Sequence, residues 1–307
     1  MSDLRRGLIS LIIVILAFHR TFAQGTYVDE IMTSYQLTGI WQVDQKRLYD
    51  PSQLVNHINR LIQYSLDTAF SLREKSYQVM DDISRQPSGT TVGALVLDRL
   101  VKGLSDPAAV VRTTCVQRLM HFPDNLFSFE QQQAVLEMAI SEESPDAIKL
   151  TGYLNPPHAI PVILPIIHQT GSSRAARMAA RMAVARMGDP EQILFFQSVI
   201  RKAELNDDNL LAIGEVVSYI RRKELVDELI RIVVSNQRSC TSTDPDHSRP
   251  ILCAYRAMEY LAQVVMNFPF GLRASGDLDT EDYPLALDMV RSWINANPDY
   301  QLIKNIY

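Results

Sequence analysis

The sequence is poor in the residues that large β folds need. Of its 307 residues only 12 are glycine and only 8% are aromatic. No stretch alternates apolar and polar residues between glycine-rich hairpin turns, so we expect no sheet. The formal net charge of −5 argues against a general nucleic-acid-binding surface. A hydrophobic fraction of 47% against 21% charged residues excludes wholesale disorder, and the length allows one large domain or two modest ones.

The sequence also lacks the motifs of common enzymes and metal sites. The six histidines form no His-x-x-x-His pair and the three cysteines form no Cys-x-x-Cys pair. There is no Gly-x-Ser-x-Gly, no phosphate-binding glycine loop and no Gly-x-Gly-x-x-Gly. The acidic pairs at 81–82 and 207–208 are sequence neighbours, and adjacent helical positions do not face each other. We therefore predict no catalytic residue, no metal ligand and no cofactor.

The first residues have the order of a secretory signal peptide. The 12-residue apolar run 7–18 follows Arg5 and Arg6, and a small-x-small cleavage site ends at Ala23. The run is short for a membrane span, which needs about 20 apolar residues, although an uncleaved anchor is the alternative. A signal peptide over residues 1–23 carries a net charge of +2, so cleavage leaves 284 residues at −7. We expect an exported protein, periplasmic or secreted, that touches a membrane only through an uncleaved leader.

Export changes how the three cysteines are interpreted. An oxidising compartment makes a disulfide between Cys240 and Cys253 plausible, because the two flank a short polar loop. Closing that loop is worth about 3 kcal/mol in the chain-entropy model. Cys115 stands in an apolar helical stripe, which favours a buried small residue over a nucleophile.

Helical periodicity covers almost the whole chain. Asp50 and Pro51 carry a helix-start signal, and apolar residues then recur three or four apart as far as residue 86, which predicts one long helix. A further pair is expected at 249–266 and 283–296. Between these we expect nine helices, at 91–103, 107–122, 128–142, 145–154, 158–168, 173–187, 190–202, 208–220 and 223–236.

The helices pair at an irregular but recurring interval. Most connections are short, which makes successive helices antiparallel neighbours. The mean spacing between the first helices of successive pairs is near 35 residues, a repeat signature. These first helices begin at residues 107, 145, 173, 208 and 249.

One segment resembles a known family. In 176–190 an arginine, Arg177, is followed by an alanine-rich stripe and the turn 188–190, Gly-Asp-Pro. This resembles the short bacterial HEAT repeats, and Arg112 stands at the equivalent arginine position. The resemblance is best over 107–202 and implies an all-α fold, a short HEAT-like α-solenoid of antiparallel helix pairs.

The resemblance divides the chain into four parts. After the signal peptide we predict an N-terminal helical segment at 24–90, which contains the long helix. HEAT-like repeats follow at 91–236 and a C-terminal helical cap with long loops at 237–307. A cap is expected because a terminal repeat must cover its exposed face.

Arginines on one helix face are the first candidate contacts. Arg174, Arg177 and Arg181 are spaced i, i+3, i+7, so they share a face. The resemblance implies that such residues brace a neighbouring repeat. The alternative is an anion-binding groove shared with Arg221 and Arg222. Methionines 178, 182 and 187 are interpreted as core residues.

The irregular stretches 237–249 and 267–282 are the second candidates, because long loops in helical domains are often functional. The latter carries Phe268, Phe270 and Leu272, which we interpret as capping residues or, alternatively, as a partner contact.

These patterns favour a non-catalytic function. We expect an exported scaffold or adaptor that binds a protein or peptide partner through its helical-repeat surface, and no nucleic acid. The alternatives are an enzyme or enzyme-partner subunit, which a resemblance to HEAT-like lyases implies, an envelope glycan-binding protein, and a purely architectural protein. Oligomeric state is left open by the sequence.

Overall fold

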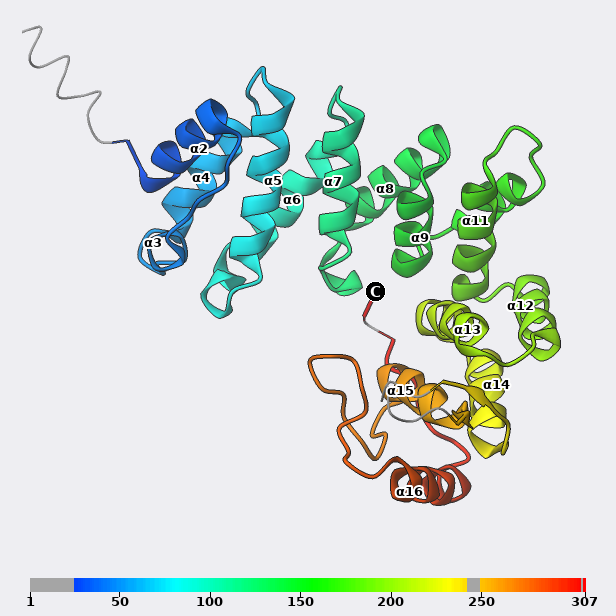
Figure 1. Cartoon of the computed structure of the whole chain (residues 1–307). Helices are drawn as coiled ribbons and strands as arrows, with labels where there is room; N and C mark the ends of the chain where they lie inside the picture. Colours follow the sequence, from blue (N-terminus) through cyan, green and yellow to red (C-terminus); the bar gives the residue numbers. More distant parts are fainter. Residues whose placement is uncertain (1–24, 242–248, 305) are drawn as a thin grey trace, which may run out of the picture. The chain divides into compact units, whose positions relative to one another are not determined.

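The fold is all-α, as predicted. The computed structural model describes residues 25–241, 249–304, 306 and 307 (Figure 1). Within them lie fifteen α-helices, α2 to α16, with three short 3₁₀ segments and two short strands. The predicted signal peptide, residues 1–23, lies outside the described residues. Among the described helices, none has the length and apolar character that crossing a membrane requires.

Two compact units make up the chain, Met1–Leu119 and Met120–Tyr307. The division falls inside the predicted repeat segment 91–236. Whether the helix pairs form a HEAT-like solenoid, and whether the chain divides at residues 90 and 236, stays a prediction.

The N-terminal unit is a series of helices in which each packs on its neighbours. Contacts join α2 to α3 and α4, α4 to α5, and α5 to both α6 and α7 (Figure 1). The elements are α2 (Tyr27–Thr38), α3 (Gln45–Leu48), α4 (Leu54–Tyr64), α5 (Phe70–Ser84), η1 (Pro87–Thr91), α6 (Gly93–Gly103) and α7 (Ala109–Leu119).

The prediction of one long helix over residues 50–86 is wrong, because the chain breaks into α4 and α5. Asp50 caps a turn by accepting a hydrogen bond from the Ser52 amide at 2.9 Å, and α4 begins only at Leu54. At the break, the Asp67 carboxylate accepts from the Ala69 amide at 2.8 Å. An Asp side chain that bonds the backbone two residues on stabilises a turn over a helix. The apolar period continues across this turn, which explains why it was missed.

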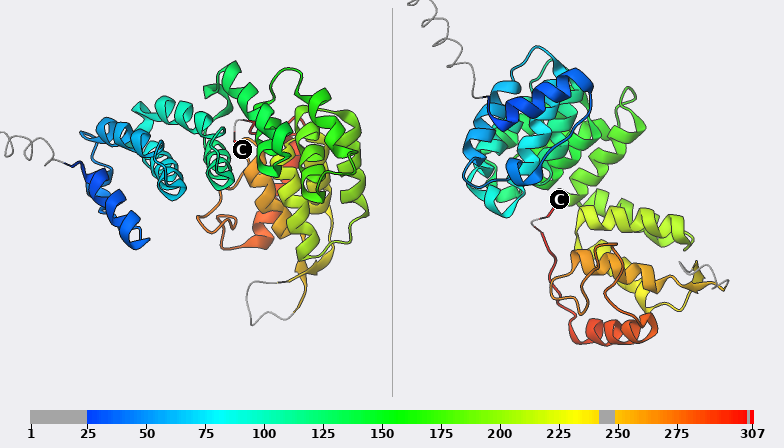
Figure 2. Two further views of the ribbon diagram at one scale, coloured as in Figure 1. Left: turned by 90° about the horizontal axis from the view of Figure 1, so that it is seen from above. Right: turned by 60° about the vertical axis from the view of Figure 1, so that its left-hand side comes forward.

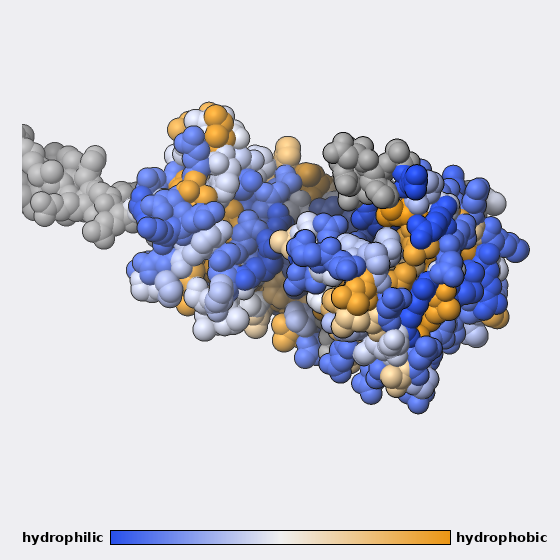
Figure 3. Space-filling model, turned by 60° about the horizontal axis from the view of Figure 1, so that its bottom comes forward, coloured by the Kyte–Doolittle hydropathy of each residue, from blue (hydrophilic) through white to orange (hydrophobic). Residues whose placement is uncertain are grey.

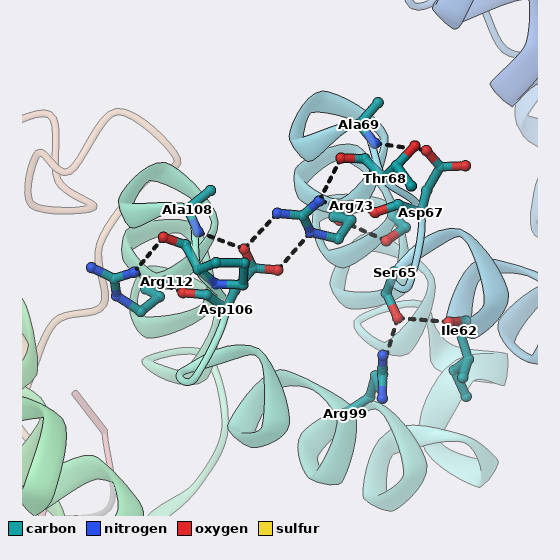
Figure 4. A network of polar contacts seen from close by, with 12 residues as sticks. Ile62, Ser65, Asp67, Thr68, Ala69, Arg73, Arg99, Asp106, Ala108 and Arg112 are labelled. Atoms are coloured by element: carbon teal, nitrogen blue, oxygen red, sulfur yellow. Dashed lines mark hydrogen bonds and ion pairs between the residues drawn. The ribbon is translucent and has the colours of Figure 1, made fainter.

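A buried arginine then fixes the start of α5 and joins it to α7 (Figure 4). Arg73 donates to the carbonyls of Asp67 and Thr68 at 2.9 and 3.0 Å. Its other nitrogens form a two-pronged ion pair with the Asp106 carboxylate at 2.7 and 2.8 Å. Arg112 repeats the arrangement, donating to the Asp106 carbonyl at 2.7 Å. In both cases the arginine stands six residues after an aspartate that opens the turn.

Cys115 is buried, as predicted. It lies on α7 where that helix approaches α6, and a Cβ on Gly103 would lie 2.3 Å from the Cys115 Sγ. Burial raises the pKa of the Cys115 thiol, which keeps the thiol protonated and unreactive at neutral pH.

The C-terminal unit contains the remaining helices and both strands. Its first half comprises η2 (Asp124–Leu126), α8 (Phe129–Glu142), α9 (Pro145–Leu154), α10 (Ala159–Ile163), η3 (Leu164–Ile167) and α11 (Arg174–Met187). Its second half comprises α12 (Pro190–Lys202), α13 (Asp207–Ile220), α14 (Lys223–Val234), β1 (Arg238–Cys240), β2 (Ile251–Leu252), α15 (Ala254–Val264) and α16 (Tyr283–Ala296).

Eight of the nine helices predicted between residues 91 and 236 are confirmed, with ends within three residues of those expected. The helix expected at 158–168 is instead the short α10 followed by η3. Pro165 lacks the amide proton that an α-helical bond needs, and the chain continues there as a 3₁₀ turn. The predicted turn at 188–190 is also confirmed: Gly188 ends α11 in the left-handed conformation, Asp189 caps α12, and Pro190 is its first residue.

Close helix packing forms the core of this unit. α9 packs between α8 and α11, and α11 also contacts α12 and α13 (Figure 1). A Cβ on Gly152 of α9 would lie 2.6 Å from the Ala183 Cα of α11, so small residues let these two backbones approach. Further along, α15 packs on α13, α14 and α16 (Figures 1 and 2).

The prediction of no sheet is wrong in one place, where β1 and β2 pair antiparallel. Cys240 at the end of β1 forms a disulfide with Cys253, as predicted, across a sequence separation of 13. The strands are too short to show alternation in the sequence. They also explain why α15 begins at Ala254 and not near residue 249.

Replacing Asp106 by Ala tests the buried ion pair. We expect Asp106→Ala to lower the free energy of unfolding by about 3 kcal/mol, because it leaves the Arg73 cation buried without its carboxylate. The exposed pair of Asp98 and Lys102, 2.7 Å apart, is the control, and Asp98→Ala should cost under about 1 kcal/mol. Urea titration of the two variants and the wild type measures both values.

The Asp106 contribution also depends on pH. The hydrogen bonds from Arg73 lower the pKa of Asp106 below its ordinary value of 3.8. The stabilisation is therefore complete above about pH 4 and is lost as the pH falls through the lowered pKa. The stability difference between wild type and Asp106→Ala should shrink between about pH 4 and pH 2 in the same urea titrations. A difference that is constant over this range would contradict the ion-pair assignment.

Removing the disulfide should also destabilise the C-terminal unit. We expect the double variant Cys240→Ala, Cys253→Ala to lower the free energy of unfolding by about 3 kcal/mol, since the unfolded chain regains the freedom of a short closed loop. Urea titration measures the change. Alkylation under native conditions is the accompanying check: Cys115 should stay unmodified in wild type and variant alike.

Candidate functional site

A groove in the C-terminal unit is the candidate site. It lies among α11, α12 and α13 and has a volume of 710 Å³. Its floor is apolar and buried, and includes Met182, Phe196, Ile200 and Ile213. Polar side chains also line it and can orient a bound group, namely Lys149, Asn209, Glu215, Ser218, Arg221 and Gln263.

Two apolar side chains in this groove are open to solvent. Met178 is 40% exposed and Val199 is 48% exposed, and both line the groove. On the face shown in Figure 3, apolar surface comes in separate patches between hydrophilic side chains. Single exposed apolar residues are ordinary, but apolar residues that line a hollow make it a candidate binding surface. The prediction that methionines 178, 182 and 187 are core residues is therefore wrong for Met178.

A cluster of aromatic rings around a buried cation stands at one end of the groove. The Arg186 guanidinium lies 4.9 Å from the centre of the Tyr153 ring and 5.0 Å from that of Tyr219. The Tyr307 ring meets the same two rings edge-on, at 5.6 and 5.8 Å. We call Tyr153, Arg186 and Tyr219 the aromatic box, and the Tyr307 ring fills it. Burial raises the pKa of Tyr219 and of Tyr307, so both hydroxyls are neutral at physiological pH.

Arginines near the box join the ends of α11 and α13. Arg186 donates to the Tyr219 carbonyl at the end of α13, and Arg222 donates to the Arg186 carbonyl at 3.0 and 2.6 Å. The carbonyls at a helix C-terminus lack partners within the helix and form the negative end of its dipole. Arg186 of α11 therefore stabilises the end of α13, and Arg222, which follows α13, stabilises the end of α11.

Two features of this arrangement require a glycine at position 188. Its φ of 107° is a conformation that side chains disfavour. A Cβ there would also lie 2.8 Å from the Arg222 Nη2.

Arg221 has an unusual backbone as well as a buried side chain. It ends α13 in the left-handed conformation with φ 50° and donates to the Ser218 and Ile303 carbonyls at 2.8 and 2.7 Å. Burial lowers its pKa to about 10, which still leaves it charged at neutral pH. Of the five arginines singled out from the sequence, Arg221 is the one that lines the groove.

The other predicted arginines have different surroundings. Arg174 is exposed at the start of α11, and Arg177 donates to the Ser172 carbonyl. Arg181 donates to the Gln192 side chain at 2.7 Å and lies 4.4 Å from the centre of the Phe195 ring, a groove residue. The bracing of a neighbouring repeat that the HEAT resemblance implies stays a prediction. A role in partner binding stays a prediction for all five.

A second, more polar cavity of 860 Å³ bears on the predicted anion-binding groove. Arg221, Arg222, Lys223 and Lys304 line it. Carbonyls already hold the two arginines, and Lys223 pairs with the Asp227 carboxylate at 2.9 Å. Much of the charge around this cavity is therefore used within the protein.

The predicted loop residues Phe268, Phe270 and Leu272 are half-buried against the core of the C-terminal unit. Phe268 packs edge-on against Trp293 of α16, with ring centres 5.8 Å apart, and Leu272 pairs with Leu278 in an isolated bridge. These contacts agree with the capping interpretation. Part of the other predicted loop, residues 242–248, lies outside the described residues.

The site offers binding chemistry. Within the described ranges, no three His, Cys, Asp or Glu side chains are grouped in a way that would hold a metal ion. The groove combines an apolar floor with a lysine, a carboxylate and amides that also line it. Such a lining buries an apolar side chain and fixes its orientation by hydrogen bonds.

No protein-family model matches this chain, and no curated protein sequence matches it. The HEAT resemblance thus rests on the residues quoted for it. The aromatic box was missed because its members are far apart in the sequence. The one signal available was the excess of arginine and alanine in α11, whose 14 residues include four arginines and no acid.

A substitution at Gly188 tests how tightly the helix ends are held. We expect Gly188→Ala to lower the free energy of unfolding by at least about 1 kcal/mol, because an alanine is strained at this φ and crowds Arg222. Gly171→Ala is the control, since no atom lies within 4 Å of the added Cβ, and it should change stability by under about 0.5 kcal/mol. Equal effects of the two substitutions in urea titration would contradict the assignment.

Proposed function

We propose that this chain is a non-catalytic binding module that takes an apolar segment of a protein or peptide partner into the groove among α11, α12 and α13. The observation that carries the proposal is the solvent exposure of Met178 and Val199 over a floor of buried apolar residues. Leaving such side chains in water costs about 25 cal/mol for each Å² of apolar surface, and a bound apolar group recovers that cost.

The charged residues around the groove further define the proposed partner. α11 carries four arginines and no acidic residue, and Arg174 is exposed on the same helix as Met178. On the α13 side the groove is lined by Glu215. A segment with an apolar side chain for the floor and a carboxylate beside α11 complements this pattern. The proposed partner is therefore an apolar segment flanked by an acidic residue.

Export is part of the same proposal. The disulfide between Cys240 and Cys253 is compatible with an oxidising compartment, and disulfides are rare in reducing ones. The proposed site of action is thus the periplasm or the extracellular space, with the signal peptide as the route. This supports an adaptor or scaffold that works outside the cytoplasm.

Peptide selection on the full chain tests the groove. A random peptide library displayed on phage is selected against the immobilised protein, and the selected peptides are synthesised for affinity measurement. We expect them to share an apolar residue next to an acidic one. Val199→Asp should weaken their binding at least about tenfold, because it places a charge in the apolar groove.

Leu285→Asp is the matched control. Leu285 is an exposed apolar residue on α16, at 57% exposure, and does not line the groove. It should leave the affinity unchanged, and both variants should unfold at the wild-type urea concentration since both side chains are exposed. Peptides that bind wild type and Val199→Asp equally well, or a library without enrichment, would refute the groove as the binding site.

A further inference from the structure

The last described residues of the chain lie against the segment that follows α15. We call residues 301–304, 306 and 307 the tail; it is the red segment that ends at the C mark in Figure 1. The Met266 amide donates to the Gln301 carbonyl at 2.8 Å, and the Ile303 amide donates to the Val264 carbonyl at 2.9 Å. Val265 and Leu302 form an antiparallel bridge between these bonds. The tail is thus joined to the segment that follows α15 by one isolated bridge and two backbone hydrogen bonds.

Arginines hold the tail by its main chain. Arg221 donates to the Ile303 carbonyl at 2.7 Å, and Arg186 donates to the Ile306 carbonyl at 3.0 Å. Every peptide has such carbonyls, so these bonds require an extended conformation and no particular side chains. The same holds for the strand pairing at Val265.

One tail side chain has a specific place. The Tyr307 ring lies against Tyr153 and Tyr219 beside the Arg186 cation, and it also lines the groove. An aromatic ring gains both edge-to-face contacts and the proximity of a cation in these surroundings. The aromatic box therefore selects an aromatic residue.

The tail is only shallowly anchored. Leu302, Ile303 and Tyr307 are half-buried, and Ile306 is 54% exposed. By contrast, Val264 of α15, whose carbonyl accepts from the Ile303 amide, is completely buried. A segment with few buried side chains opens locally at a lower free energy than the core to which it is attached.

We propose that the tail occupies, within its own chain, a binding site for an extended peptide segment that carries a tyrosine. A partner segment displaces the tail, pairs with residues 264–266, offers its carbonyls to Arg221 and Arg186, and places its tyrosine in the aromatic box. The inference deepens the proposed function, because Tyr307 borders the groove and its departure lengthens the groove. In this proposal the tyrosine of the partner segment gives specificity, and the hydrogen bonds to its main chain give affinity.

The tail sequence itself is the probe. A dye-labelled synthetic peptide with the sequence of Asp299–Tyr307 is titrated into full-length wild type and into the full-length variant Tyr307→Ala, and fluorescence anisotropy reports binding. Wild type should bind weakly, since its own ring fills the box. Tyr307→Ala should bind the peptide at least about tenfold more tightly. A peptide with Tyr307→Ala should lose that gain.

The control variant is Tyr255→Ala, which removes another half-buried tyrosine with a single ring contact, to Tyr283. It leaves the tail in place and should bind the peptide as weakly as wild type. A folded Tyr307→Ala that does not bind the peptide, or an equal gain in Tyr255→Ala, would overturn the proposal.

Amide hydrogen exchange of the wild type keeps the proposal testable if Tyr307→Ala does not fold. The amides of Ile303 and Met266 should exchange through a local opening, well before the Arg221 amide that bonds Val217 at the end of α13. Exchange of all three only with global unfolding would overturn the proposal.

The two proposals fail separately. If Val199→Asp weakens the selected peptides while the tail peptide binds nothing, the groove function stands and the tail inference falls. If the tail peptide binds Tyr307→Ala while the library yields no enrichment, the tail inference stands alone.

Discussion

The carbonyl groups at helix ends and helix junctions constrain this structure more than any other feature. A chain of short helices has many such junctions, and each leaves backbone acceptors that no helical bond satisfies. Arginine side chains supply the donors. Arg73 and Arg112 bind the carbonyls of the turns before α5 and α7, and Arg291 binds the Val233 and Ser235 carbonyls at the end of α14. With its five N–H groups an arginine can bind a junction and still reach a second element, as Arg73 does with Asp106.

Hydrogen bonds from arginines to carbonyls also shape the candidate site. Arg186 and Arg222 tie the end of α11 to the end of α13, and these two helices form two walls of the groove. The groove is thus held open by hydrogen bonds at its end and by packing at its floor. Binding sites built on fixed helices keep their shape without a ligand, which reduces the ordering cost of binding.

Local signals in the sequence predicted much of this fold and little of the site. Turns such as 188–190 combine a glycine, a capping aspartate and a proline, so the helix ends there follow from neighbouring residues alone. The break between α4 and α5 depends on Arg73, and the apolar period runs through it undisturbed. The aromatic box and the ring that fills it bring together residues 153, 186, 219 and 307, and no local pattern links positions so far apart. The arginines were visible in the sequence, but their partners were carbonyls, which no sequence pattern displays.

The carbonyl partners of Arg186 and Arg221 also bear on the ligand that we propose for the box. Arg186 and Arg221 are buried with carbonyls and aromatic rings as their nearest acceptors, which solvate a cation but do not cancel its charge. Burial is the main reason that the pKa of Arg221 falls, and the Arg186 charge adds to it. The proposed partner segment would bring carbonyls and a tyrosine ring to these surroundings, whereas a simple anion would have to displace the carbonyls that hold the helix ends together.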